Sequence, residues 1–334
     1  MANSAEVDKS IYFVPESGWY PVFLAFGLML TVTGLAGWLN DVSAGGSGDS
    51  TQSLVGFAIV ALVLYSWFAK VIEENTAGLN NEAVQRSYIW GMGWFIFSEV
   101  MFFAAFFGAL FYVRTFVVPW LGGEGDKGIT NYLWPAFEAT WPVVQNPDAA
   151  LFVNPGQSME APGVTDVSVV QNPDAALFVN PGQSMEAPGV TDVSAWGAYL
   201  PFYNTVILLS SSVTVHFAHD AIKAENRQKL IGWLGLTVLL GAIFLVLQVA
   251  EYIHAYQDLG LTLGSGIYGS TFFILTGFHG FHVTLGTFML LIQLFRAIKG
   301  HFSPKDCFGF EASSWYWHFV DVVWVGLFIF VYVV

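Results

Sequence analysis

The sequence predicts an all-α membrane protein with seven transmembrane helices, for three reasons. Its 334 residues are 55% hydrophobic and only 11% charged, whereas a soluble domain carries about 25% charged residues. Seven apolar stretches reach the roughly 20 residues that a helix needs to cross a bilayer. A backbone in hydrocarbon must satisfy its own hydrogen bonds, so these stretches are expected to be helices.

The first spans differ mainly in length and in their connections. The first is too long for a signal-peptide core and no A-x-A-like cleavage site follows it, so it should remain as a helix. A Gly/Ser-rich turn and then a polar segment separate the first three spans. The third span has more residues than the bilayer needs and should tilt or protrude. In chain order the seven spans are expected at 18–39, 52–73, 88–119, 196–219, 229–256, 265–299 and 314–334.

We expect two parts, 1–75 with the N-terminal tail and the first two spans, and 76–334 with the other five. The connection 120–195, between the third and fourth spans, contains a perfect tandem repeat. "VVQNPDAALFVNPGQSMEAPGVTDVS" occupies 143–168 and recurs letter for letter at 169–194. Solenoids usually need three or more units that have diverged, so two identical copies do not indicate a repeat fold. A recent duplication and an error in the assembled sequence explain the repeat equally well.

The basic residues predict how the chain is oriented. The net charge of −14 lies largely in the 120–195 connection and the tails, and we assign it no partner and no nucleic-acid binding. Lys and Arg decide membrane orientation. A cytoplasmic N-terminus leaves only Arg114 and Lys127 outside and, across seven spans, puts the C-terminus on the outer side. The nine cytoplasmic residues are then Lys9, Lys70, Arg86, Lys223, Arg227, Lys229, Arg296, Lys299 and Lys305.

One carboxylate, Glu99, lies inside the aromatic run "WFIFSEVMFFAAFFGALFYVR" at 94–114. Charged groups inside spans are costly, so each is a functional hypothesis by default. Two interpretations stay open: a structural acid that is hydrogen-bonded to a neighbouring helix, and a group that handles a proton or binds a partner. Both require that something pairs with the acid, which we expect to be buried among phenylalanines.

Further polar residues within spans are interpreted as structural. Glu251 follows Gln248 by three residues and shares its helix face, which favours a hydrogen bond. His318 and Asp321 are also three apart and are expected to pair as packing contacts between helices.

A basic group after the sixth span consists of Arg296, Lys299, His301 and Lys305. Two interpretations of this group stay open: the general excess of basic residues on the cytoplasmic side, and a binding site for a lipid phosphate.

Histidines occur in pairs at 216 and 219 and at 279 and 282, and each pair lies along one helical face where it has the spacing to hold a metal or heme. No C-x-x-C-H, H-E-x-x-H or multi-cysteine pattern accompanies them. The single cysteine, Cys307, excludes an internal disulfide and a thiolate cluster built from this chain alone. We therefore expect no catalytic residue, no metal and no redox cofactor here, with His279 and His282 as structural polar groups.

Four segments resemble subunit III of cytochrome c oxidase: "FSEVMFF", "NTVILLSSSVTVHFAH", "TGFHGFHVTLGT" and "FGFEASSWYWHFVDVVW". The resemblance covers nearly the whole chain apart from 120–195. The stretch "RSYIWGMGWFIFSEVMFFAAFFGALFYVR" is similar to gammaproteobacterial members in particular. It implies a multi-pass protein of a bacterial inner membrane, with a cytoplasmic N-terminus and a periplasmic C-terminus.

The resemblance implies helices 1–2 and helices 3–7 around a V-shaped, lipid-filled cleft, and a subunit without redox groups. Its partners would be subunit I, with two hemes and a copper, subunit II, with the dinuclear copper that accepts electrons from cytochrome c, and possibly a small subunit IV. It would support proton uptake into subunit I and protect the oxygen-reducing site. Glu99 matches the family's buried, carbodiimide-reactive carboxylate, and Arg296, Lys299 and His301 match contacts to a phospholipid headgroup.

Some positions depart from the family pattern. After helix 2 the family often has "REG..GHHT", where this chain has Glu73, Asn80 and Asn81, which puts the lipid contacts from that side in doubt. In the fourth helix the family has two adjacent histidines, where this chain has His219 and Asp220. In the third helix Gly108 stands where the family usually has an aromatic residue. Two alternatives remain: an independent transporter or proton channel, although no inverted repeat is visible, and the third subunit of a quinol oxidase or nitric oxide reductase.

Overall fold

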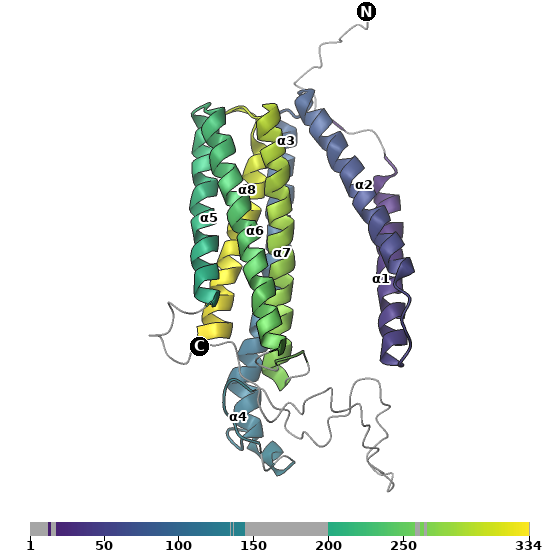
Figure 1. Cartoon of the computed structure of the whole chain (residues 1–334), viewed down its shortest axis with the longest axis vertical. Coiled ribbons are helices and arrows are strands. Elements are labelled where there is room, and N and C mark those ends of the chain that lie inside the picture. Colours follow the sequence, from purple (N-terminus) through teal and green to yellow (C-terminus); the bar gives the residue numbers. More distant parts are fainter. Residues whose placement is uncertain are drawn as a thin grey trace, which may run out of the picture. The chain divides into compact units, whose positions relative to one another are not determined.

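The structure is a computed structural model of the whole chain, and it describes residues 13–14, 18–133, 135, 137–143, 200–257, 261–263 and 266–333. Within these residues the regular elements are helices, with one isolated bridge between Ser303 and Asp306. Seven helical segments of the described chain are long and apolar enough to cross a membrane, which confirms the predicted fold class (Figure 1). The tandem repeat lies outside the described residues, apart from Val143.

The helices follow the predicted spans closely. The first part of the chain contains α1 (Tyr20–Ser43), α2 (Thr51–Thr76) and α3 (Glu82–Tyr112), which continues through the π-helical turn η1 (Val113–Val117) into α4 (Val118–Leu121). A short 3-10 helix follows, η2 (Gly128–Tyr132). The second part contains α5 (Leu200–Lys223), α6 (Arg227–Gln257), α7 (Gly266–Lys299) and α8 (Phe308–Leu327), which continues as the π-helical η5 (Phe328–Val333).

The helices extend beyond the apolar stretches because polar residues can continue a helix into the headgroup region. The third span runs for 40 residues, Glu82–Leu121, which at 1.5 Å per residue is about 60 Å, twice the roughly 30 Å of hydrocarbon. The last helix begins at Phe308, whereas the sequence predicted a start at 314. Phe310 and Ser313 are buried in its first turns, so side chains pack inward where we expected a connection. The predicted start of the fourth span, 196–199, lies outside the described residues.

The chain divides into two compact units, and the boundary falls inside α3, between Trp90 and Gly91. Unit 1 contains α1, α2 and the first turns of α3. Its two full helices approach closely at two glycines: a Cβ on Gly34 would lie 2.4 Å from the backbone nitrogen of Ser53, and a Cβ on Gly56 would lie 2.4 Å from that of Thr31. Small residues that let backbones approach in this way are typical of helix contacts in membranes.

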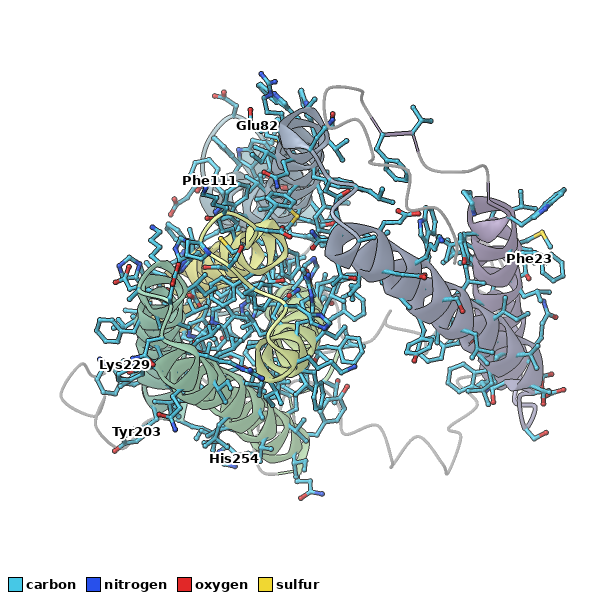
Figure 2. All side chains as sticks on the ribbon, turned by 90° about the horizontal axis from the view of Figure 1, so that it is seen from above. Phe23, Glu82, Phe111, Tyr203, Lys229 and His254 are labelled. Atoms are coloured by element: carbon cyan, nitrogen blue, oxygen red, sulfur yellow. The ribbon has the colours of Figure 1, made fainter. Side chains whose placement is uncertain are left out.

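Unit 2 contains the rest of α3 and helices α5 to α8, with α8 as its most buried helix. Figure 2 shows this bundle from above, with its side chains converging on the middle. Trp317 of α8 is fully buried, and its indole nitrogen donates a hydrogen bond to Ser211 Oγ of α5 at 2.9 Å. Its ring fills the space beside Gly241 of α6 and Gly286 of α7. One aromatic side chain therefore joins four helices.

The α3 helix contacts α7 and α8 mainly through large aromatic rings. Ring centroids lie 5.0 Å apart for Phe102 and Phe278, and 6.0 Å apart for Phe103 and Phe319. Further along α3, Phe107 lies 6.1 Å from Phe330 of η5. Large rings hold the helix backbones further apart than small residues would. A polar side chain of α3 can therefore extend between the rings to α7.

Arg227, the first residue of α6, caps the end of α7. Its Nε donates to the Ala297 carbonyl at 3.1 Å, and its Nη2 donates to the Ile298 carbonyl. The last carbonyls of a helix have no partner within the helix, so a cationic donor stabilises that end. Gly300 follows the helix at φ +79°, in the conformation that ends many helices.

Replacing Arg227 by glutamine is expected to lower the stability of unit 2 by about 1 kcal/mol, because the last carbonyls of α7 lose two charged donors. Thermal denaturation of the purified protein in detergent measures the change. Lys229→Gln is the matched control, since Lys229 lies two residues on and is exposed. Equal losses in the two variants would show that only the positive charge matters, not the cap.

Candidate functional site

Glu99 of α3 pairs with His282 of α7. The distance from His282 Nε2 to Glu99 Oε2 is 2.9 Å. The histidine side chain is 7% exposed and the carboxylate side chain 23% exposed. The partner that the sequence required for Glu99, but did not identify, is thus a histidine 183 residues along the chain.

The other nitrogen of His282 decides how the pair holds its proton. Nδ1 lies 2.6 Å from the Phe278 carbonyl oxygen, and a carbonyl only accepts, so Nδ1 carries a hydrogen. Nε2 then either accepts a hydrogen bond from a protonated Glu99 or, in the imidazolium form, donates to the carboxylate. Either way the pair shares one proton and has no net charge. A neutral pair explains why an acid is tolerated within an apolar span.

The surroundings of Glu99 differ from the expected cage of phenylalanines. Residues three and four positions apart share a helix face, so Phe102 and Phe103 lie beside the carboxylate and ring His282, with centroids 6.0 and 5.0 Å from the imidazole. Phe97 and Met101 point elsewhere and are 52% and 55% exposed. The carboxylate is therefore half-buried at the edge of the α3–α7 contact and reaches the outside of unit 2.

His279 lies one turn before His282 but has different partners. Its Nε2 lies 3.2 Å from the Val320 carbonyl of α8, where it donates, and its ring packs against Phe244 and Trp324. The two histidines are three residues apart, but His279 pairs with α8 and His282 pairs with α3. Their spacing in the sequence therefore does not bring the two rings to a common position.

Glu251 is enclosed near the end of α6. Gln248 donates to Glu251 Oε2 at 3.1 Å, and both side chains are buried. The hydroxyl of Tyr268 donates to the Val331 carbonyl at 3.0 Å in the same region of the bundle. The structure thus contains the hydrogen bond between Gln248 and Glu251 that their spacing favoured, and this bond lies near α7 and η5.

His318 and Asp321 on α8 lie close but share their contacts with α5. His318 Nδ1 lies 2.7 Å from Ser212 Oγ and 3.7 Å from Asp321 Oδ2. The shorter contact joins α8 to α5, so the serine is the closer partner. We missed Ser212 in the sequence because it is 106 residues away and nothing in its own neighbourhood distinguishes it.

The basic residues after the sixth span share one end of unit 2 with those between the fourth and fifth spans, because Arg227 contacts the end of α7. We call this the basic end and define it as Lys223, Arg227, Lys229, Arg296, Lys299, His301 and Lys305. Arg296 is only 7% exposed there. Its Nη1 donates to Gln293 Oε1 at 3.2 Å, and its guanidinium lies 4.8 Å from the ring of Phe302. A Cβ on Gly309 would lie 2.4 Å from Nη1, so Arg296 fits tightly between α7 and α8.

Lys299 and His301 reach the surface of the basic end more readily than Arg296. Lys299 is exposed and His301 is partly exposed. Burial lowers the pKa of His301, and the charges of Arg296 and Lys299 lower it further. At neutral pH His301 is therefore a neutral N–H donor, and Lys299 is the accessible positive charge of the three residues matched to a lipid site.

A group of three possible metal ligands also lies at the basic end, and the sequence did not predict it. His219 of α5 lies 3.1 Å from Glu311 of α8, and Cys307 completes a group whose ligand atoms all lie within 4.8 Å of one another. The four-residue spacing of Cys307 and Glu311 was a visible signal. His219, 92 residues earlier, was grouped with His216 instead.

Comparison with known proteins gives a match over most of the chain. The family model described as "Cytochrome c oxidase subunit III" matches residues 10–125 and 178–334. The segment it leaves unmatched, 126–177, contains the whole first copy of the tandem repeat, 143–168.

Curated relatives match at nearly full length. The chain is 36% identical over 330 residues to "Cytochrome c oxidase subunit 3" of Aedes aegypti, with 98% of each chain covered. The protein of the same name from Drosophila melanogaster is 36% identical over 332 residues, again with 98% of each covered. That from Pongo abelii is 34% identical over 329 residues, also at 98% of each.

Proposed function

The chain belongs to the cytochrome c oxidase subunit III family, and on that premise we propose that it is a non-redox, integral subunit of a proton-pumping oxidase that reduces dioxygen to water. We propose that it packs on subunits I and II, and possibly a small subunit IV, which hold the hemes and copper and receive electrons from cytochrome c. Its own role is to support proton uptake and stability of subunit I. The membrane is a bacterial inner membrane, with the basic end in the cytoplasm.

The observation that supports the proton-related role is the Glu99–His282 pair. It holds one proton between an acid and a base 2.9 Å apart, and Glu99 is partly exposed at the outside of unit 2. That proton can shift between the acid and the base without changing the pair's net charge, because the acid and the base neutralise each other in both forms. Such a pair suits a group that holds a proton close to a partner subunit.

We also propose that the basic end binds a phospholipid headgroup through Arg296, Lys299 and His301. Lys299 supplies the exposed charge for the phosphate, and His301 supplies a neutral N–H donor. Arg296 adds positive potential from beneath, since its guanidinium is held by Gln293 and Phe302. Anionic headgroups are attracted to such clusters at the membrane boundary.

The test starts from the whole complex, purified by a tag on this chain from its own membranes. Heme absorbance and peptides of the two larger subunits are expected to copurify with the chain, and reduced cytochrome c is expected to be the preferred donor over quinol. Purification as a heme-free protein that conducts protons or a solute in liposomes would overturn the proposal in favour of a transporter or channel.

Glu99→Gln is expected to leave the heme spectrum unchanged and the initial turnover within about twofold, because no electron passes through this residue. The glutamine amide can still donate to His282 Nε2, so the geometry survives while the exchangeable proton is lost. We expect proton uptake to slow and its pH profile to change, measured with a pH-sensitive dye during single turnovers. Loss of heme in this variant would contradict the proposal.

Two further variants separate proton handling from structure. Glu99→Leu leaves Nε2 of the buried His282 without a partner, at a cost of about 1–3 kcal/mol, so it should lower stability where glutamine does not. Glu82→Gln, at the exposed start of α3, is the control and should change neither stability nor proton uptake. If Glu82→Gln and Glu99→Gln slow proton uptake equally, the effect is one of overall charge.

A further inference from the structure

Three side chains that commonly bind metals converge at the basic end of unit 2. His219 lies in the last turns of α5, Cys307 is the residue before α8, and Glu311 lies one turn into α8. His219 Nε2 and Glu311 Oε1 are 3.1 Å apart, and the ligand atoms of all three residues lie within 4.8 Å of one another. In a tetrahedral zinc site with metal–ligand bonds of 2.0–2.3 Å, ligand atoms are about 3.5 Å apart, so small side-chain rotations suffice.

The fold holds each ligand in place. The backbone N–H of Glu311 donates to the Cys307 carbonyl at 3.0 Å, which fixes the two α8 ligands one helical turn apart on the same face. The ring of His219 packs against Phe310, with centroids 5.9 Å apart. A ligand from α5 and two from the start of α8 therefore meet because the two helices pack together, and not because they are close in sequence.

The cluster is sheltered on one side and accessible on the other. Cys307 is 8% exposed, while the side chains of His219 and Glu311 are 22% and 31% exposed. An ion can thus enter from the water at the basic end and reach a sulfur that is otherwise buried. This combination of a buried thiol with two accessible ligands differs from a surface acidic patch, because nitrogen, sulfur and oxygen donors come from two helices.

We propose that His219, Cys307 and Glu311 form a zinc-binding site, with water or a group of a neighbouring subunit as the fourth ligand. One imidazole, one thiolate and one carboxylate suit Zn²⁺, which accepts all three donor types. Mg²⁺ and Ca²⁺ prefer oxygen ligands only. The ion would clip the end of α5 to the beginning of α8 and would take no part in electron transfer, since Zn²⁺ has no redox chemistry.

Binding has to release a proton. Burial, with smaller contributions from Glu311 and Asp306, raises the pKa of the Cys307 thiol to about 11, and Lys223 opposes the shift. Without metal the thiol is therefore protonated at neutral pH. Zn²⁺ replaces that proton, which passes to water as the Zn–S bond forms.

The decisive experiment is X-ray absorption at the zinc edge on the purified oxidase complex, stripped with chelator and then reloaded with Zn²⁺ alone. We expect one sulfur neighbour at about 2.3 Å and nitrogen or oxygen neighbours at about 2.0–2.1 Å. Cys307→Ser should abolish the sulfur signal, and His219→Asn or Glu311→Gln should weaken zinc binding at least tenfold. Zinc bound without a sulfur neighbour in the wild-type complex would overturn the proposal.

Two controls keep the result independent of folding defects. His216→Asn alters a histidine on the same helix whose side chain is 65% exposed and pairs with Asp220, and it should leave zinc binding unchanged. In the unmodified complex, Zn²⁺ should also protect Cys307 from maleimide, as read from peptide mass mapping of this chain's single cysteine. Equal alkylation of Cys307 with and without saturating Zn²⁺ would count against the site without any substitution being made.

Discussion

Gly34→Val is expected to separate α1 from α2 and to destabilise unit 1 by about 3 kcal/mol, the upper range for overpacking. A Cβ at this position would lie 2.4 Å from the Ser53 nitrogen and 2.9 Å from its Cα. These are backbone atoms, so no change of rotamer can relieve the clash, and the helices have to move apart. The measurements are thermal denaturation in detergent and the rate of protease cleavage in the connection between the two helices.

The control for this prediction lies three residues further along the same helix. A Cβ on Gly37 would meet nothing within 4 Å, so Gly37→Val introduces the same side chain into the same helix without a clash. Valine also has a higher helix propensity than glycine, so the control variant is expected to gain a little stability. Similar losses at both positions would mean that the close approach of the two helices does not stabilise unit 1.

The helices were predictable because the bilayer imposes a simple rule on their composition. A span of about 20 apolar residues is visible without any knowledge of its neighbours. The boundaries were less predictable, as the start of α8 illustrates: Glu311 and Ser313 read as polar connection, but they belong to a helix that has already begun at Phe308. The tight contacts at Gly34 and Gly286 were not predictable either, since a glycine in a span looks the same whether a neighbour touches it or not.

The candidate site was predictable only in part. Glu99 stands out because a lone carboxylate in an apolar run is costly, and that cost implies a partner. The partner's identity depends on which helices pack together, so His282 followed only from the structure. The same reason hid the group formed by His219, Cys307 and Glu311, because its members come from distant parts of the chain and form no metal-binding sequence motif.

The second large effect concerns unit 2, where Gly286→Val is expected to cost about 3 kcal/mol. A Cβ on Gly286 would lie 2.9 Å from Cε3 of Trp317. That tryptophan is fully buried and hydrogen-bonded to Ser211, so it has little room to retreat. His282 lies one turn before Gly286 on α7, and displacement of α7 should also weaken its contact with Glu99. Gly286→Val is therefore expected to slow proton uptake as well as to lower stability.

A double-mutant cycle tests whether Trp317 is the cause. Trp317→Ala alone should cost about 3–5 kcal/mol through the cavity it leaves, but adding Gly286→Val should then cost almost nothing more, because the valine enters that cavity. The two changes are thus expected to be strongly non-additive, as contacting residues usually are. Gly280→Val on the same helix, where a Cβ would meet nothing within 4 Å, is the control and should be additive with Trp317→Ala. Additive losses for Gly286→Val and Trp317→Ala would show that the clash is relieved elsewhere and that α7 is not held by this tryptophan.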